Sequence, residues 1–327
     1  MPSLTQKHEV LFPVKMVPVY TKLSTAGSRT GSLIRIPGKR TIVNLRTGTP
    51  VSIVGSGYRL VTNEEALDAA YECCSAVFPE THQSEWDLGP VFAPSTGSYC
   101  HIDLIHSTAA LQFDFLMEGS RPEVPNTFGP FIRVTNSYNS MRALSFSVGF
   151  MQKTCSNGLV GPSKIIRFKF DHTRKSLQAG LKFTIKHRQL KKMKKRFLDS
   201  FQVLHEYPVD PHLFSPLVIA VLKIKKPNLP DSRNATKRQK KESEVWAVLE
   251  SHIKRLSERY AHEQGANAYA VLNTMTDLSS NPPVNKFLRR DRHSMQKLAG
   301  EWMADFRKSS RKPNFEINEY LPKSDSS

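Results

Sequence analysis

The sequence predicts an α+β fold, in which a largely antiparallel sheet with packed helices is followed by a helical C-terminal region. Between residues 143 and 150, large apolar side chains alternate with small ones: Leu144, Phe146, Val148 and Phe150. This period of two is typical of a strand with one buried face. Near the C-terminus the apolar residues follow the helical period instead: Trp246, Leu249, Ile253, Leu256 and Tyr260. The order of the two patterns separates a sheet-containing part from a helical part.

The region 131–170 is expected to form the centre of the sheet. A short strand at 131–135, a turn at 136–140 and the alternating strand predict a hairpin. A second turn at 155–158 leads to a third strand, where Ile166, Phe168 and Phe170 lie on one face and Arg167 and Lys169 on the other. We therefore expect an apolar back and an exposed, basic, Ser-rich front.

The remaining elements are expected around this centre. Residues 1–50 favour short edge strands and turns, because Pro and Gly recur among scattered Val and Ile. Residues 51–61 predict a strand, and Thr62 with Glu65 has the capping-box spacing that begins a helix. Further strands are expected at 98–105 and 109–118. The N-terminal region is also basic, through Arg29, Arg35, Lys39, Arg40 and Arg46.

Four segments are predicted along the chain. An α+β core domain with a basic sheet face covers residues 1–226, and a polar, basic linker covers 227–241. A helical region at 242–312 contains the Trp246 helix and two more helices, at 266–278 and 285–307. Residues 313–327 are expected to form a loose tail.

Length and composition favour a globular cytoplasmic protein. The 327 residues are 39% hydrophobic, enough for a sizeable core. No apolar run approaches the roughly 20 residues of a membrane-spanning helix, and the N-terminus lacks the pattern of a signal peptide. The four cysteines form no CxxC motif, so we expect reduced, mostly buried thiols.

Net charge is the strongest compositional observation. The chain has 47 Lys and Arg against 29 Asp and Glu, a net charge of +18, which indicates a polyanionic partner. Thirteen of these cations lie between residues 164 and 196, with Asp171 as the single acid. The predicted binding residues there are Arg167, Lys169, Arg174, Lys175, Lys182, Lys186, Arg188, Lys191, Lys192, Lys194, Lys195 and Arg196. A solvated helix face is the alternative interpretation, because Leu190, Met193, Phe197, Phe201 and Leu204 form the opposite, apolar side.

Aromatic residues stand beside basic ones at two further places. Tyr138 lies near Arg142, and Tyr58 lies near Arg59. Aromatic rings combined with positive charge hold nucleic-acid single strands without reading their sequence. Tyr138, Arg142 and Tyr58 are therefore candidate contacts to bases and phosphates.

The common catalytic motifs are missing, including GxxxxGK[ST], GxGxxG, HExxH and GxSxG. On a strand, Cys100 and His106 would share one face while His101 and Asp103 share the other, so no metal site and no cofactor are predicted. His172 remains the one weak catalytic candidate, as a general base. A two-metal nuclease centre could use Asp87, Asp103, Asp114 and Glu118, but their spacing does not require one.

The run NSYNSMRALSFSVGFMQKTCSNGLV at 136–160, followed by Asp171-His172-Thr173, resembles the signature of a phage/plasmid-like family catalogued as domain of unknown function 932. The stretches GYRLVTNEEALDAA and NAYAVLNTMTDLSSN are also similar to that family, so the resemblance covers residues 51–298. It implies that the protein is carried by phages, plasmids or integrated elements, and it implies no mechanism.

Taken together, these observations predict a non-enzymatic nucleic-acid-binding protein of a mobile genetic element. Single-stranded DNA is favoured over RNA as the ligand, in replication or recombination. Two alternatives stay open: a metal-dependent nuclease or nucleic-acid-modifying enzyme, and an interaction protein that targets a host replication or defence factor.

Overall fold

The computed structural model describes residues 10–23, 32–79, 81–106, 128–152, 158–159, 167–173, 187–227, 236–283 and 292–322. The chain divides into two compact units. Unit 1 comprises Met1–Thr108, Phe131–Val148 and Ile166–Lys186, and unit 2 comprises Ala109–Pro130, Gly149–Ile165 and His187–Ser327. The α+β fold with helices toward the C-terminus is confirmed.

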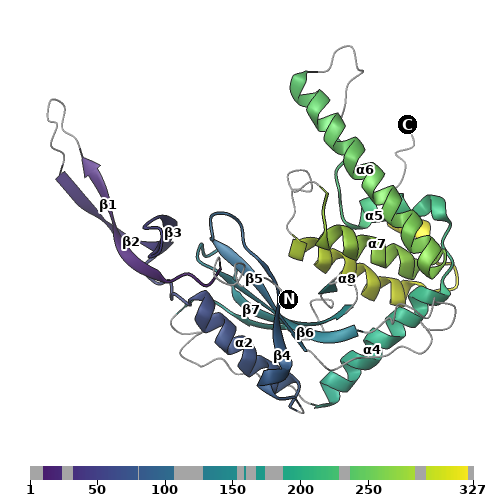
Figure 1. The fold of residues 1–327 in the computed structure, drawn as a ribbon, viewed down its shortest axis with the longest axis horizontal. Helices are drawn as coiled ribbons and strands as arrows, with labels where there is room; N and C mark the ends of the chain where they lie inside the picture. Colours follow the sequence, from purple (N-terminus) through teal and green to yellow (C-terminus); the bar gives the residue numbers. More distant parts are fainter. Residues whose placement is uncertain are drawn as a thin grey trace. The chain divides into compact units, whose positions relative to one another are not determined.

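A three-stranded antiparallel sheet begins unit 1 (Figure 1). Its strands are β1 (Val14–Leu23), β2 (Ser32–Asn44) and β3 (Pro50–Gly55), in the order β1-β2-β3. The turn between β2 and β3 is closed by Asn44, whose side-chain oxygen accepts from the backbone N–H of Arg46 at 2.8 Å. β1 and β2 are 10 and 13 residues long, so the prediction of short edge strands was wrong in length. A bulge accommodates their prolines instead of ending the strands.

The larger sheet has the order β4-β5-β6-β7-β8, and β9 pairs with β7. Its strands are β4 (Trp86–Phe92), β5 (Tyr99–His106), β6 (Phe128–Ser137), β7 (Leu144–Gln152), β8 (Gly158–Leu159) and β9 (Arg167–Phe170). The pairings of β4 with β5, β5 with β6, and β7 with β8 and β9 are antiparallel. The predicted strand at 109–118 and the turn at 155–157 lie outside the described residues.

Helix α2 (Asn63–Val77) packs against β5. Its N-cap is Thr62, and the predicted capping box with Glu65 is present in both directions. Ala66, Ala70 and Cys74 form part of its buried face. A short 3-10 helix, η1 (Gln83–Glu85), follows, and the Phe78 and Trp86 rings on either side of it lie 5.5 Å apart.

The serines on the polar face of β7 are buried, which corrects the expected open, Ser-rich front, whereas the basic residues of β9 on the same face are exposed as expected. Ser145 and Ser147 lie opposite Lys169 and Arg167 on paired strands, so the predicted sharing of a face is confirmed. The two serines are nevertheless only 1% and 7% exposed, while Arg167 and Lys169 are exposed. Alternation predicts which residues share a face, but it does not say whether that face is open to water.

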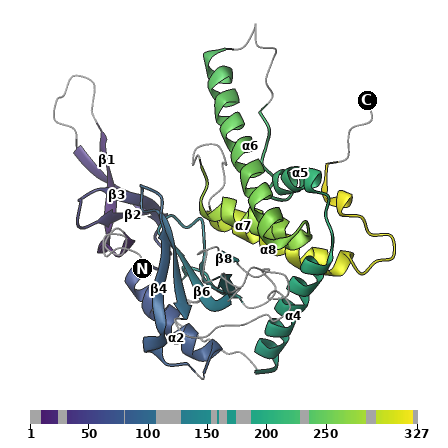
Figure 2. The ribbon, with the colours of Figure 1, turned by 45° about the vertical axis from the view of Figure 1, so that its right-hand side comes forward.

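Unit 2 is built mainly from helices (Figure 2). They are α4 (His187–Glu206), α5 (Pro211–Val221), α6 (Lys237–Gln264), α7 (Ala268–Ser280) and α8 (Arg292–Ser309), followed by the 3-10 helix η3 (Ile317–Tyr320). α7 packs against the other four α-helices, and all of its residues are buried. No helix in the described ranges is both long and apolar enough to cross a membrane.

The structure differs from the predicted segments at three places. α4 and α5 belong to unit 2 rather than to a domain ending at residue 226. α6 begins at Lys237, after an N-cap at Thr236 with a capping box, so the last third of the predicted linker, residues 237–241, is helical. In the predicted loose tail, Ile317 is buried and the Tyr320 hydroxyl donates to Asp305 at 2.9 Å. Polar composition alone did not reveal these caps and anchors.

Candidate nucleic-acid interface

The predicted basic residues are divided between the two units. Arg167 and Lys169 are exposed on β9 in unit 1, whereas Lys192, Lys195 and Arg196 are exposed on α4 in unit 2. The apolar side of α4 is confirmed by burial of Phe197, Phe201 and Leu204. Arg174, Lys175, Lys182 and Lys186 lie outside the described residues, as do the side chains of Arg188, Lys191 and Lys194.

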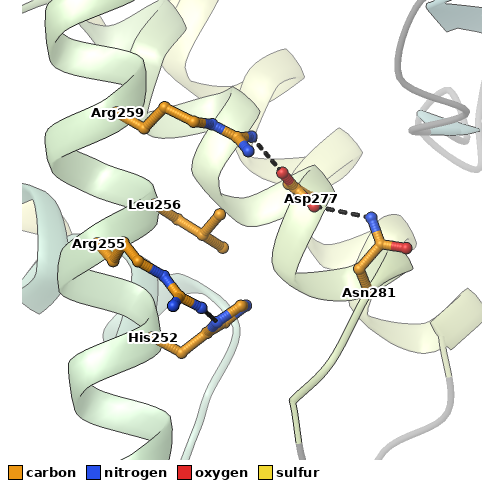
Figure 3. Close-up of a pocket in the computed structure, with 6 residues that line it drawn as sticks. All are labelled: His252, Arg255, Leu256, Arg259, Asp277 and Asn281. Carbon is orange, nitrogen blue, oxygen red and sulfur yellow. Dashed lines mark hydrogen bonds and ion pairs between the residues drawn. The ribbon is translucent and has the colours of Figure 1, made fainter.

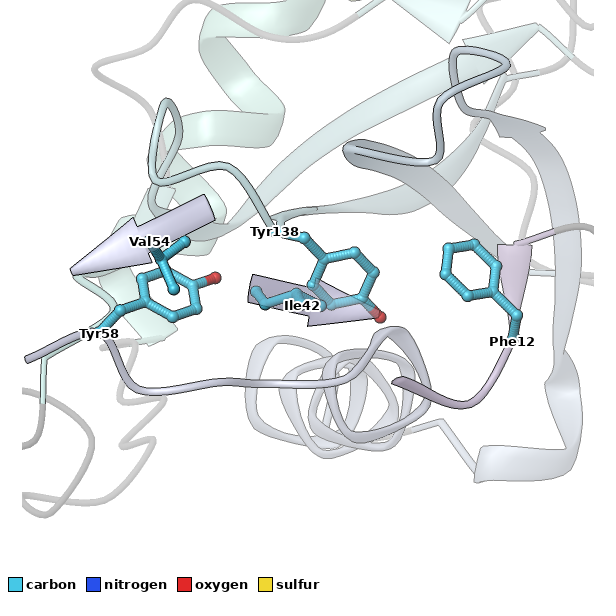
Figure 4. Close-up of a cluster of buried hydrophobic side chains, with 5 residues drawn as sticks. All are labelled: Phe12, Ile42, Val54, Tyr58 and Tyr138. Atoms are coloured by element: carbon cyan, nitrogen blue, oxygen red, sulfur yellow. The ribbon is translucent and has the colours of Figure 1, made fainter. Parts of the chain in front are cut away.

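Tyr138 and Tyr58 cannot act as stacking platforms, which corrects the sequence prediction. Tyr138 is fully buried and Tyr58 is 8% exposed. Both rings belong to a hydrophobic cluster with Phe12, Ile42 and Val54, which joins the three-stranded sheet to the rest of unit 1 (Figure 4). Burial raises the pKa of both phenols. The turn that contains Tyr138 therefore has a structural role.

Hydrogen bonds from the same turn reinforce this junction. The Tyr138 hydroxyl accepts from the backbone N–H of Asn63 at 2.9 Å, at the start of α2. The Asn136 side chain donates to Asn63 Oδ1 at 2.8 Å. The Tyr58 hydroxyl donates to the Ser137 carbonyl at 2.5 Å, and the Ser52 hydroxyl donates to the Tyr138 carbonyl. Strand β3, helix α2 and strand β6 are thus tied together by buried polar contacts.

Arg142 is held against the larger sheet. Its guanidinium lies 4.2 Å from the centre of the Tyr99 ring, and its Nη1 donates to His101 Nε2 at 3.2 Å. The other ring nitrogen of His101 then donates to Thr135 Oγ1, at 2.8 Å. Arg142 is half-buried, so these contacts point to a structural role rather than to an open phosphate contact.

The ligand-type residues of β5 divide between the two faces as predicted. On the face that also carries His101, Asp103 accepts two hydrogen bonds from Arg133, each 2.6 Å long. Asp103 is 1% exposed and Arg133 is 3% exposed, so the carboxylate is committed to a buried ion pair. Within the described ranges, no three His, Cys, Asp or Glu side chains form a group that could hold a metal. Asp114 and Glu118 of the nuclease alternative lie outside those ranges.

His172 has the contacts of a structural histidine. Its ring stacks on Tyr58, with centroids 4.9 Å apart and planes 17° apart. Nδ1 donates to the carbonyl oxygen of Arg59 at 3.2 Å. The residue is 8% exposed, and burial lowers the pKa of the imidazole. This geometry offers nothing in support of the catalytic role considered for His172.

The three-stranded sheet carries a basic surface. The sequence pattern indicated that this region is basic, but no binding residues were predicted there. Residues 10–63 contain eight Lys and Arg and no Asp or Glu. Six of the eight are described on this sheet and its β2–β3 turn, and all six are exposed: Lys15, Lys22, Arg35, Lys39, Arg40 and Arg46. Lys15, Lys22, Arg35, Lys39 and Arg40 make no ion pair with any described residue. The absence of acids over such a long stretch was the signal that could have revealed this surface.

The outer half of β1 and β2 is a two-stranded ribbon with both faces exposed. We call residues 20–23 of β1 and 32–35 of β2 the outer ribbon. Tyr20 lies opposite Arg35, and Lys22 lies opposite Leu33, so these four side chains share a face. The side chains of Tyr20 and Leu33 are 54% and 71% exposed. Tyr20 is the one aromatic among the large hydrophobic residues that the structure describes as exposed.

A bulge separates the outer ribbon from the inner part of the sheet. Opposite the single residue Val19, β2 has four residues, among them Pro37 and Gly38, whose φ is +68°. Such a left-handed conformation favours glycine. The inner part contributes Ile42 and Val54 to the cluster of Figure 4, while the outer ribbon contributes nothing to it. The junction is therefore anchored and the outer ribbon is free to contact a partner.

Comparison of the chain with protein-family models, curated proteins and solved structures finds no match. The resemblance to the phage/plasmid-like family catalogued as domain of unknown function 932 therefore stays a prediction from its motifs. Two of those motifs contain Asn63 and Tyr138, which join β3, α2 and β6 in this structure. Function has to be argued from the exposed surfaces of the chain itself.

Proposed function

We propose that this protein binds single-stranded nucleic acid, without catalysis, through the outer ribbon and the acid-free sheet behind it. The observation that carries the proposal is an exposed Tyr20 ring directly opposite Arg35, an arginine with no ion-pair partner among the described residues. In antiparallel sheets, directly opposed side chains have Cβ atoms about 5 Å apart. A base on the ring and a phosphate on the guanidinium can therefore be contacted together.

The chemistry of this face favours a single strand over a duplex. A base can lie flat on Tyr20 only if it is unstacked, as bases in single strands are. Lys22 and Leu33 extend the same face with a positive charge and an apolar side chain. Lys15 and Lys39, on the inner part of the sheet, add cations for further phosphates. A two-stranded ribbon also fits the major groove of B-DNA, so duplex binding is the comparison that tests this preference.

The proposal retains the setting that the sequence predicts. DNA remains the favoured ligand, and a mobile genetic element and the cytoplasm remain the expected context. The exposed cations of α4 in unit 2, Lys192, Lys195 and Arg196, supply a second basic surface that a long strand could contact.

The test is fluorescence anisotropy with a labelled single-stranded oligonucleotide and the matching duplex, over a range of salt concentrations. Tyr20→Ala should weaken single-strand binding by about 1–3 kcal/mol if a base stacks there, whereas Tyr20→Phe should retain most of it. Arg35→Gln should reduce the slope of log affinity against log salt by about 0.7, the value for one phosphate contact on a single strand. Replacing Lys15, Lys22, Arg35 and Lys39 together by Gln should reduce the slope by about 3.

Lys254→Gln provides the matched control, because it removes one exposed positive charge from α6 in unit 2. Its salt slope and affinity should equal those of the wild type. Unchanged binding by the Tyr20 and Arg35 variants, with clear wild-type binding, would move the interface elsewhere. If the wild type binds neither ligand at low salt, the proposal fails and the host-factor alternative becomes the better hypothesis.

A further inference from the structure

A pocket of about 480 Å³ lies between α6 and α7 in unit 2. Its lining residues are His252, Arg255, Leu256, Arg259, Asp277 and Asn281 (Figure 3). The first four come from α6, where their spacing places them on one side of the helix, and the last two come from the end of α7 and its C-cap. Pockets of this volume hold small molecules.

The two arginines of the pocket differ in how their charge is balanced. Arg259 donates to Asp277 Oδ2 at 2.5 Å and has Glu263 at 3.9 Å. Asp277 also accepts from the Tyr260 hydroxyl at 2.9 Å and from Asn281 Nδ2 at 2.8 Å. Arg255, by contrast, has no carboxylate partner among the described residues. Among the six lining residues, two arginines face the single carboxylate of Asp277, so the lining carries one positive charge in excess.

Arg255 is oriented by His252. One of its terminal nitrogens lies 2.7 Å from His252 Nδ1. A guanidinium can only donate, so Nδ1 accepts and the proton of the neutral ring is on Nε2. Burial and the neighbouring Arg255 both lower the pKa of His252, which favours this neutral form. Nε2 is buried and has no hydrogen-bond partner within the described ranges, so its N–H is a donor without an acceptor.

Only one of the five N–H donors of Arg255 is used by His252. The side chain is exposed, so its remaining donors can reach a ligand in the pocket. Planar guanidinium groups bind phosphate oxygens with paired, charge-assisted hydrogen bonds. The pocket thus combines a cation that has unused donors, a histidine that orients this cation, and room for more than the phosphate group alone.

We propose that this pocket binds the phosphate group of a small organic phosphate ester, with Arg255 as the main contact. His252 acts as a positioning residue, because its Nδ1 accepts the hydrogen bond that orients Arg255. Leu256 provides an apolar wall for the organic part. The inference depends only on α6 and α7, so it stands whether or not the outer ribbon binds nucleic acid.

The experiment is isothermal titration of the full chain with inorganic phosphate, a nucleoside 5′-monophosphate and the corresponding nucleoside, at constant ionic strength. We expect saturable binding of the two phosphates and none of the nucleoside. Arg255→Gln should weaken binding of the monophosphate by about tenfold or more, since a hydrogen bond to a charged group is lost with the charge. Arg255→Lys should lie between this variant and the wild type.

Two further measurements separate a specific site from general attraction of anions. Lys254→Gln removes a neighbouring charge on the same helix, outside the pocket, and should leave the monophosphate affinity unchanged. In protein labelled with ¹⁵N-histidine, the ring signals of His252 should report the Nε2–H form and should shift on titration with phosphate. The proposal is overturned if phosphate shows no saturable binding, if the nucleoside binds as tightly, or if the Arg255 and Lys254 variants lose affinity equally.

Discussion

Replacing Asp103 by Asn should destabilise unit 1 far more than an ordinary polar substitution. Asp103 and Arg133 lie directly opposite each other on β5 and β6 and share two hydrogen bonds of 2.6 Å. Their side chains are 2% and 4% exposed, so water cannot replace the lost carboxylate. Breaking a buried pair by removing one partner costs about 3–5 kcal/mol, because the other charge stays buried. Whole domains are stable by about 5–15 kcal/mol, so this loss is large.

The double variant Asp103→Leu with Arg133→Met tests the reason for that cost. Buried ion pairs are often replaced by apolar side chains with little loss, so the double variant should be more stable than Asp103→Asn alone. Unit 1 can be followed separately by hydrogen exchange of the β5 and β6 amides over a urea series. The control is Glu258→Gln in unit 2, which breaks an exposed pair with Lys254 at 3.9 Å and should cost under about 0.5 kcal/mol.

The reasoning would be refuted if Asp103→Asn cost no more than this surface control. That outcome would mean that the guanidinium of Arg133 is hydrated or compensated in the folded protein. A double variant as unstable as the single one would instead point to packing around the two side chains, rather than to loss of the carboxylate from the buried pair.

Three further predictions concern other parts of the chain. Lys192→Gln combined with Lys195→Gln should reduce the salt slope of single-strand binding by up to about 1.4, and an unchanged slope would restrict phosphate contacts to unit 1. Burial lowers the pKa of His172 in the folded protein, so below the unfolded value of about 6.5 the unfolded state binds more protons than the folded state. The free energy of unfolding should therefore decrease as the pH falls from 7 to 5. In urea titrations over this range, His172→Phe should make the free energy of unfolding less dependent on pH. Burial raises the pKa of the three described thiols, Cys73, Cys74 and Cys100, that of Cys100 to about 12. In a Cys155→Ser background, a disulfide reagent should therefore modify these thiols slowly until denaturant is added. Fast reaction of the native protein would contradict their burial.

Local sequence patterns predicted the secondary structure better than the surface. The capping box at Thr62 and the apolar side of α6 are determined by residues within a turn of each other, and both were confirmed. The sharing of a face by Ser145 and Lys169 follows from strand geometry and was also confirmed. Their exposure depends on what covers the sheet, which alternation cannot encode.

The candidate interface could be predicted only in its chemistry. The sequence showed the excess of basic residues and predicted that aromatic rings beside them would contact nucleic acid. Tyr138 and Tyr20 both belong to strand or turn regions, yet the first is fully buried and the second is 54% exposed. Tyr138 is packed in a cluster with Phe12 and hydrogen-bonded to Asn63 and Ser52, all of which are distant in sequence. The pairing of Tyr20 with Arg35 likewise depends on the register of two strands across a bulge.

The complete burial of α7 has a consequence for how unit 2 assembles. A helix of 13 residues is marginal by itself in water, and this one has no solvent-facing side on which charged residues could support it. Its backbone can persist only when α4, α5, α6 and α8 already surround it. Its amides should therefore exchange with solvent only when the whole unit opens, and α7 should be the last part of the unit to lose protection. Because α7 carries Asp277, the α7 side of the α6–α7 pocket should keep its structure until the whole unit unfolds.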